Sequence, residues 1–192
     1  MLVKLAAIFF SMILVNNYVL VKFYGICPFL GVSKKLDSAV GMSGAVIFVM
    51  FMATAVTFPL QIFVLNPAGL SYLQTIVFIL VIAVLVQFIE IFLKKYVVAL
   101  YNSLGVYLPL ITTNCAILGI ALINVESNYN FLQSVANSIG TSLGYTMAIL
   151  LFSCIREKLI EDMIPSCLRN LPIALITAAC MSIAMMGMSG IH

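Results

Sequence analysis

Charge and histidine are scarce in this sequence, and tryptophan is absent from it. Only 8% of the residues are charged and the net charge is +3, which is too little for a surface that binds nucleic acid. A single histidine, His192, excludes a histidine-rich metal site. The five cysteines form an odd set without a short CxxC pair, which argues against the disulfide framework of a small secreted protein.

Apolar residues are abundant instead. They make up 64% of the chain and the mean hydropathy is +1.23, whereas a soluble domain is about half apolar. We therefore expect an all-α membrane protein. Since about 20 apolar residues cross the hydrocarbon core, six segments qualify as spans, and the first is long enough to be retained rather than removed as a signal. They lie at roughly 3–24, 38–58, 72–93, 98–123, 133–155 and 171–190.

Lysine and arginine occupy alternate connections between these spans. The first, third and fifth connections carry them, whereas the second and fourth carry none. Because basic connections stay in the cytoplasm, both termini are predicted to lie outside, although Lys4 opposes this orientation. The second three spans then start from the opposite side of the membrane, so the single domain 1–192 divides into two inverted repeats, about 1–95 and 96–192. The basic residues are Lys34, Lys35, Lys94, Lys95, Arg156, Lys158 and Arg169.

A short motif, C-x-x-L-G, occurs once in each half, beginning at Cys27 and at Cys115. Residues that interrupt helices accompany both copies. Gly25 and Pro28 flank the first cysteine, while Pro109 and a Thr-Thr-Asn run precede the second. The repeated motif supports the inverted repeat, and its neighbours predict that the first and fourth helices are broken.

Both cysteines are expected near the middle of the bilayer. Cys27 lies six residues before the polar Ser33, and Cys115 lies nine before Asn124. Six extended residues cover about 20 Å and nine helical residues about 13 Å, each close to half of the hydrocarbon core. Irregular backbone at this depth must be buried in protein or line a cavity. We therefore expect protein to bury both thiols.

Two thiols at one depth have three interpretations on the residues alone. Packing is a common role of a buried cysteine. A disulfide is disfavoured in a membrane scaffold that faces the cytoplasm. The third interpretation is ligation of a soft metal or an iron–sulfur cluster. A [2Fe–2S] cluster needs four thiolates, so a second, similarly built subunit would have to supply the other two.

The chain resembles a known family along essentially its whole length. The runs VNNYVLVKFYGICPFLGVSKKLDSAVGM, FILVIAVLVQFIE, YNSLGVYLPLITTNCAILG, IREKL and ITAACMSIAMMGMSG are similar to those of the A-type subunits of Rnf electron-transport complexes. The E-type subunit of the sodium-pumping NADH:quinone oxidoreductase is similar too. That protein typically has Glu-Asn at the Asn16-Asn17 position and Cys-Thr at the Cys27-Pro28 position, so the Rnf side is favoured.

The resemblance implies a subunit of an ion-translocating ferredoxin:NAD oxidoreductase in the bacterial inner membrane, with periplasmic termini. It implies that Cys27 and Cys115 ligate a [2Fe–2S] cluster, which is completed by the E-type subunit of the same complex, a homologue of opposite topology. The B, C, D and G subunits would complete the complex and carry the flavins and further clusters; no GxGxxG fingerprint is present in this chain.

Four supporting residues are expected around such a cluster. Helix N-termini and glycine-rich turns present backbone N–H groups to anions, and glycine permits a close backbone approach. These residues are Gly25, Gly31, Asn114 and Gly119. Two alternatives remain. Broken first and fourth helices are also typical of a small inverted-repeat transporter, and the thiols of a purely structural scaffold would serve only packing.

Overall fold

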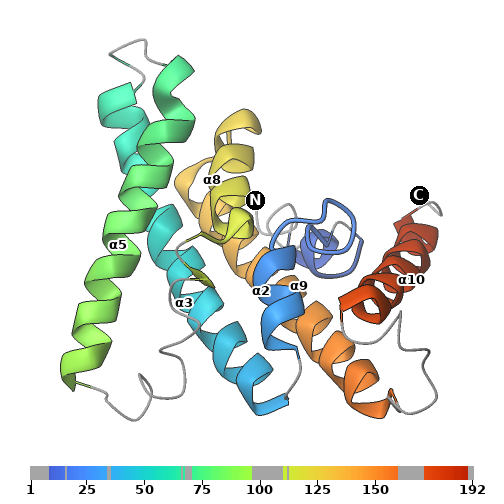
Figure 1. The fold of residues 1–192 in the computed structure, drawn as a ribbon. Helices are drawn as coiled ribbons and strands as arrows, with labels where there is room; N and C mark the ends of the chain where they lie inside the picture. Colours follow the sequence, from blue (N-terminus) through green and yellow to red (C-terminus); the bar gives the residue numbers. More distant parts are fainter. Residues whose placement is uncertain are drawn as a thin grey trace.

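The computed structural model describes residues 9–15, 17–33, 36–65, 67, 71–96, 110–111, 113–159 and 171–189. Within these ranges every regular element is a helix and there is no strand (Figure 1). The all-α prediction is therefore confirmed for this part of the chain.

Among the described residues, three helices are long and apolar enough to cross a membrane. The first is α3 (Leu36–Leu60) with the π-helical turn η2 (Gln61–Leu65) that continues it. The second is α5 (Gln74–Tyr96), which follows the 3-10 turn η3 (Ser71–Leu73). The third is α9 (Phe131–Lys158). These helices correspond to the predicted second, third and fifth spans.

The helix of the second span is longer than predicted. The sequence predicts that this span ends at about residue 58, yet α3 continues through Pro59 and η2 extends the helix to Leu65. A proline removes one helical hydrogen bond and pushes the preceding turn aside. Here the helix nevertheless continues, with the π-helical turn η2 directly after Leu60.

The segments predicted as the first and fourth spans are interrupted in their described parts. The π-helical η1 (Ser11–Val15) is followed by the non-helical segment 17–25, and the short α2 (Ile26–Val32) begins only after it. Residues 110–111 are helical, 113–114 are not, and α8 (Cys115–Glu126) then begins. The sixth predicted span corresponds to α10 (Leu171–Ser189).

Helices α3 and α9 form the most extensive contact and occupy the middle of the molecule, with α5 at one edge and α10 at the other (Figure 1). Small residues of α9 let η1 approach closely. A Cβ atom added to Gly144 would lie 3.0 Å from the carbonyl oxygen of Met12, and one added to Gly140 would lie 3.2 Å from that of Phe9. Such small-xxx-small spacing is typical of packed membrane helices.

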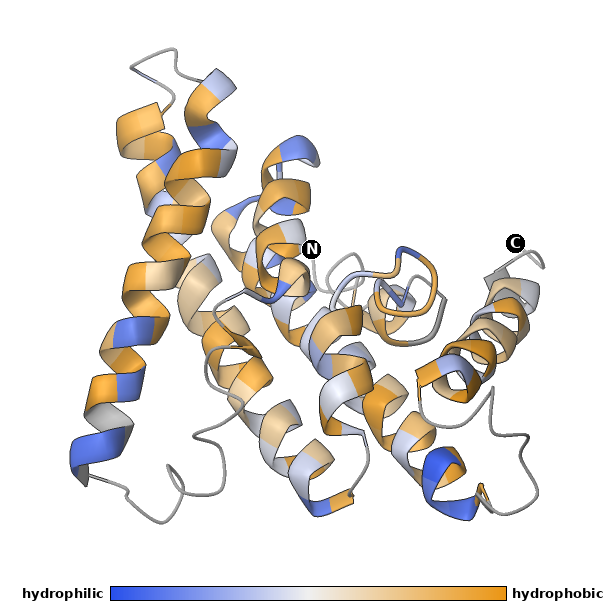
Figure 2. Cartoon of the chain, in the orientation of Figure 1, coloured by the Kyte–Doolittle hydropathy of each residue, from blue (hydrophilic) through white to orange (hydrophobic). Residues whose placement is uncertain are grey.

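In α3 and α5 the hydrophilic residues lie mainly toward the helix ends and the middles are largely apolar (Figure 2). Helix α9 differs, because it carries buried polar residues such as Asn137, Thr141 and Ser142. The last turns of α5 and α9, which hold Lys94, Lys95, Arg156 and Lys158, lie on the same side of the molecule as the start of α3 (Figures 1 and 2). This arrangement agrees with the alternation of basic connections along the sequence.

Candidate functional site

The non-helical segment 17–25 carries the chain from η1 to the first cysteine motif. Asn17 fixes its start, because the side-chain Nδ2 donates to the Gly144 carbonyl at 2.9 Å and Oδ1 accepts from the Val19 N–H at 3.1 Å. Farther along, the Ser182 hydroxyl of α10 donates to the Leu20 carbonyl. The segment is therefore anchored to both α9 and α10 before it reaches Gly25.

The two cysteine motifs meet at Gly25. Its backbone N–H donates to the Sγ atom of Cys115, with a nitrogen–sulfur distance of 3.0 Å. Gly25 has a φ of +85°, in the left-handed region that glycine alone enters without strain. Turns 90 positions apart in the sequence are thus joined at the sulfur of one of the two predicted ligands.

Gly25 also fits tightly among its neighbours. A Cβ atom at this position would lie 3.2 Å from Ala116 Cβ, 3.2 Å from Asn114 Oδ1 and 3.3 Å from the Tyr145 ring. Any side chain larger than hydrogen would therefore push the backbone of this turn away from α8. Both the dihedral angle and the available space account for the glycine here.

Cys115 is the first residue of α8, and its position is set locally. The preceding residue, Asn114, is 3% exposed and caps the helix, because its Oδ1 accepts from the Ala116 N–H at 3.0 Å. The sulfur of Cys115 consequently lies at the positive end of the helix dipole, where negative charge is stabilised. The N–H of Gly25 adds a hydrogen-bond donor aimed at the same atom.

Cys27 is the second residue of α2 and lies two residues after Gly25. Cα atoms two residues apart are separated by at most about 7 Å, so the backbone of Cys27 lies within about 12 Å of the Cys115 sulfur. Both cysteines are free and exposed. The described part of the chain therefore leaves both thiols exposed, contrary to our expectation that protein buries them.

The remaining predicted supporting residues differ from each other. Gly119 packs closely, because a Cβ atom there would lie 2.9 Å from Cδ2 of the Tyr24 ring. Gly31, which occupies the same place in the first motif, is exposed and a Cβ atom added to it would meet nothing within 4 Å. The structure thus joins Gly25, Asn114 and Cys115 at one junction, packs Gly119 against Tyr24, and leaves Gly31 without a close approach.

This chain does not hold a complete metal site in its described part. No group of three or more histidine, cysteine, aspartate or glutamate side chains lies close enough there to bind a metal ion. Two exposed thiols on adjoining turns can supply half of a four-thiolate site.

Residues 5–192 match the family model described as Rnf-Nqr subunit, membrane protein. The chain belongs to this family. The resemblance read from the sequence is therefore confirmed. Curated members of the Rnf-Nqr family match this chain at high identity and over nearly their whole length.

One relative, from Acetobacterium woodii, is named as the A subunit of the Na(+)-translocating ferredoxin:NAD(+) oxidoreductase complex. It is 56% identical over 183 residues, which are 95% of this chain and 95% of the relative. A relative from Serratia proteamaculans, named as the A subunit of an ion-translocating oxidoreductase complex, is 52% identical over 184 residues, 96% of this chain and 95% of the relative. A relative of the same name from Syntrophotalea carbinolica is 50% identical over 188 residues, 98% of this chain and 97% of the relative.

Sequence reasoning missed two residues that shape the thiol site of this Rnf-Nqr protein. Tyr145 is fully buried next to Gly25, and its hydroxyl has no hydrogen-bond partner among the described residues. Arg156 donates from Nη1 to the Leu30 carbonyl and to the Ser33 hydroxyl, both at 2.9 Å. Both belong to α9, far from either motif in the sequence, so no local pattern could have connected them with the cysteines.

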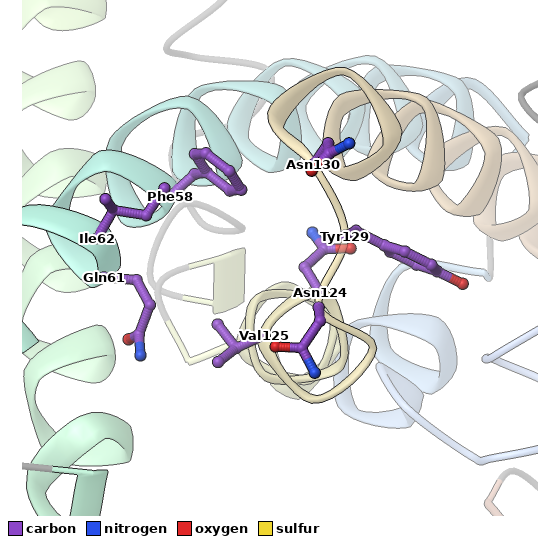
Figure 3. Close-up of a pocket in the computed structure, with 8 residues that line it drawn as sticks. Phe58, Gln61, Ile62, Asn124, Val125, Tyr129 and Asn130 are labelled. Carbon is purple, nitrogen blue, oxygen red and sulfur yellow. The ribbon is translucent and has the colours of Figure 1, made fainter. Parts of the chain in front are cut away.

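A pocket of about 210 Å³ opens at the other end of α8 (Figure 3). Asn124 belongs to its lining and is 6% exposed, and its Oδ1 accepts from Nδ2 of Asn137 at 2.7 Å. Nine residues of helix, or about 13 Å, separate Asn124 from Cys115, so this pocket is distinct from the thiol site. The lining residues are Phe58, Gln61, Ile62, Asn124, Val125, Asn128, Tyr129 and Asn130.

Proposed function

We propose that this chain is the A-type subunit of an ion-translocating ferredoxin:NAD oxidoreductase, and that it carries electrons through a [2Fe–2S] cluster. Cys27 and Cys115 would supply two of the four cysteine ligands. The other two would come from the homologous E-type subunit. Each of the two proteins would have six spans built from two inverted repeats, and their topologies in the membrane would be opposite. The B, C, D and G subunits would complete the complex, which would lie in the inner membrane with the termini of this chain on the periplasmic side.

The single observation that carries this proposal is the hydrogen bond from the Gly25 N–H to the Cys115 sulfur. It supports a shared site for the two motifs, because the residues around Cys27 and Cys115 adjoin each other although the motifs lie in different halves of the chain. The names of the relatives support the activity of the complex. The exposure of both thiols supports a ligand set that a second protein completes.

The cluster would supply one-electron transfer near the middle of a membrane that is about 30 Å thick. The residues of this chain would bind it and adjust its charge. Cys27 and Cys115 would hold the iron, and the Gly25 N–H would donate to one ligand sulfur. An added electron is costly in a medium of low dielectric constant. The N-terminal end of α8 and the N–H donor would offset part of this cost.

The experiment that tests this proposal uses the purified complex, in which this chain is accompanied by its E-type homologue. Cys27→Ser and Cys115→Ser should each remove one iron–sulfur signal from the electron paramagnetic resonance spectrum and lower the iron and sulfide content, while the other centres persist. Cys154→Ser and Cys180→Ser are matched controls, because these cysteines are also free and exposed but lie outside the motif. Retention of that signal in both motif variants would contradict the proposal.

The same measurement separates the two alternatives. A small inverted-repeat transporter, or a scaffold whose thiols only pack, would tolerate serine at both motif positions without loss of iron. The E-type protein of a sodium-pumping NADH:quinone oxidoreductase would also use the two cysteines. In that case the signal would be found in a complex that reduces quinone instead of NAD.

A further inference from the structure

Arg156 joins the last turn of α9 to the end of α2. Its Nη1 atom donates to the Leu30 carbonyl and to the Ser33 hydroxyl, each at 2.9 Å, across 126 and 123 positions of sequence. Ser33 is fully buried and Arg156 is half-buried. The contact is therefore a defined interaction inside the protein and not a solvated surface charge.

The short α2 needs such a partner. It has only seven residues, and the last four carbonyl groups of any helix lack a helical hydrogen-bond donor. An arginine at this end satisfies a carbonyl and complements the negative end of the helix dipole. The second motif differs, because α8 continues from Leu118 to Glu126, so the corresponding Leu118 carbonyl lies within a helix.

One face of α9 follows α2 along its length. Tyr145 contacts Gly25 just before α2 begins, and the ring of Phe152 stacks on Phe29 with centroids 4.4 Å apart and an interplanar angle of 27°. Arg156 lies four residues after Phe152, on the same helical face, and binds the end of α2. These contacts fix the start, the middle and the end of the helix that bears Cys27.

We infer that Arg156 is a positioning residue, whose contact with the end of α2 sets the place of Cys27 relative to Cys115. This inference rests on the proposed function in so far as the two thiols bind one cluster. If the positive charge of Arg156 served only to orient the helix in the membrane, any basic residue at this end of α9 could replace it. Lys158 is such a residue: it lies in the same last turn and is exposed.

The test compares Arg156→Gln with Lys158→Gln, since each variant removes one positive charge from the same turn of α9. In the purified complex, Arg156→Gln should lose cluster occupancy and should broaden or split the resonance spectrum of the cluster that depends on Cys27. Lys158→Gln should keep both at the wild-type level. Arg156→Lys should restore part of the occupancy, because a lysine can reach only some of the same acceptors.

A second readout does not require the cluster. Nitroxide labels on Cys27 and Cys115 report the distance between the two positions, in the full complex from which iron has been removed and in which the other three cysteines of this chain are replaced by serine. We expect a broadened distance distribution in Arg156→Gln and in the milder Ser33→Ala, but not in Lys158→Gln. Ser33→Ala removes one of the two acceptors, and it therefore decides the question if the arginine variant does not assemble.

The outcomes distinguish the two proposals. If the wild-type complex lacks a cluster that depends on Cys27, the proposed function fails, and the label distances alone decide the role of Arg156. If the cluster is present but neither the spectrum nor the distance distribution changes in Arg156→Gln or Ser33→Ala, the positioning role is overturned. Equal effects of Arg156→Gln and Lys158→Gln would likewise overturn it, because they would show that only the charge matters.

Discussion

Replacing Gly25 by alanine tests the junction between the two cysteine motifs. Alanine would have to adopt the φ of +85° found at this position. Its Cβ atom would meet Ala116, Asn114 and Tyr145 at 3.2–3.3 Å, whereas carbon atoms pack best at about 3.5–4.0 Å. The backbone must then move away from α8, and the N–H of residue 25 moves away from the Cys115 sulfur.

The cost can be worked out from these two effects. A left-handed conformation costs an L-residue about 1–2 kcal/mol, and forcing a methyl group into a packed site costs about 1–3 kcal/mol. The expected loss in the free energy of unfolding is therefore about 2–5 kcal/mol. For a chain of this size, each kcal/mol lowers the melting temperature by about 2–4 °C, so the expected decrease is about 4–20 °C.

Gly31→Ala is the matched control from α2, the helix that begins directly after Gly25. Gly31 lies in α2, is exposed, and has open space around the position of a Cβ atom. Because alanine favours a helix over glycine by about 0.5–1 kcal/mol, this variant should be neutral or slightly more stable.

The assay is thermal unfolding of the detergent-solubilised complex, followed by the loss of this chain from it, together with the iron content of the folded fraction. Gly25→Ala should unfold at lower temperature and retain less iron, and Gly31→Ala should do neither. Equal melting temperatures for the two glycine variants would refute the reasoning, since only one of them has a strained dihedral angle and close neighbours.

Two further predictions use the same assay. Gly119→Ala should lower the free energy of unfolding by about 1–3 kcal/mol, because its Cβ atom would lie 2.9 Å from the Tyr24 ring. Adding Tyr24→Leu should recover part of this loss. Strictly additive losses in the double variant would show that the ring is not the obstacle. Asn114→Ala should lower the free energy of unfolding by about 1 kcal/mol, because α8 loses its cap, whereas Asn114→Ser should retain most of the stability. Equal losses in the two variants would contradict the capping role.

The helix starts beside the two cysteines could be predicted largely from the sequence because their signals are local. Residues that disfavour helix precede each motif, and the structure accordingly starts α2 at Ile26 and α8 at Cys115. Asparagine before a run of apolar residues is a strong helix cap, and Asn114 plays that part. Glycine in a turn indicates either an unusual dihedral angle or a close approach, and Gly25 combines both.

Other features depend on contacts that no local pattern specifies. Gly31 and Gly119 occupy equivalent motif positions, yet only Gly119 has an aromatic ring above it, and Tyr24 comes from the other half of the chain. The second span was predicted to end at about residue 58, but its helix runs through Pro59 to Leu65, although a proline usually ends a helix. The sequence shows a charge at Arg156, but not that its partners lie more than a hundred positions away.

The two halves of the chain therefore place their cysteines by different means. Cys115 is positioned by its own helix, which has a cap before it and ends only at Glu126. Cys27 lies on a helix of seven residues, and isolated helices of that length are unstable because nucleation is costly. Its position must be supplied by tertiary contacts, and the Phe29–Phe152 stack and the Arg156 hydrogen bonds are two of them. Two copies of one motif are thus held in place by different contacts. Substitutions in α9 should therefore shift the position of Cys27 more than that of Cys115.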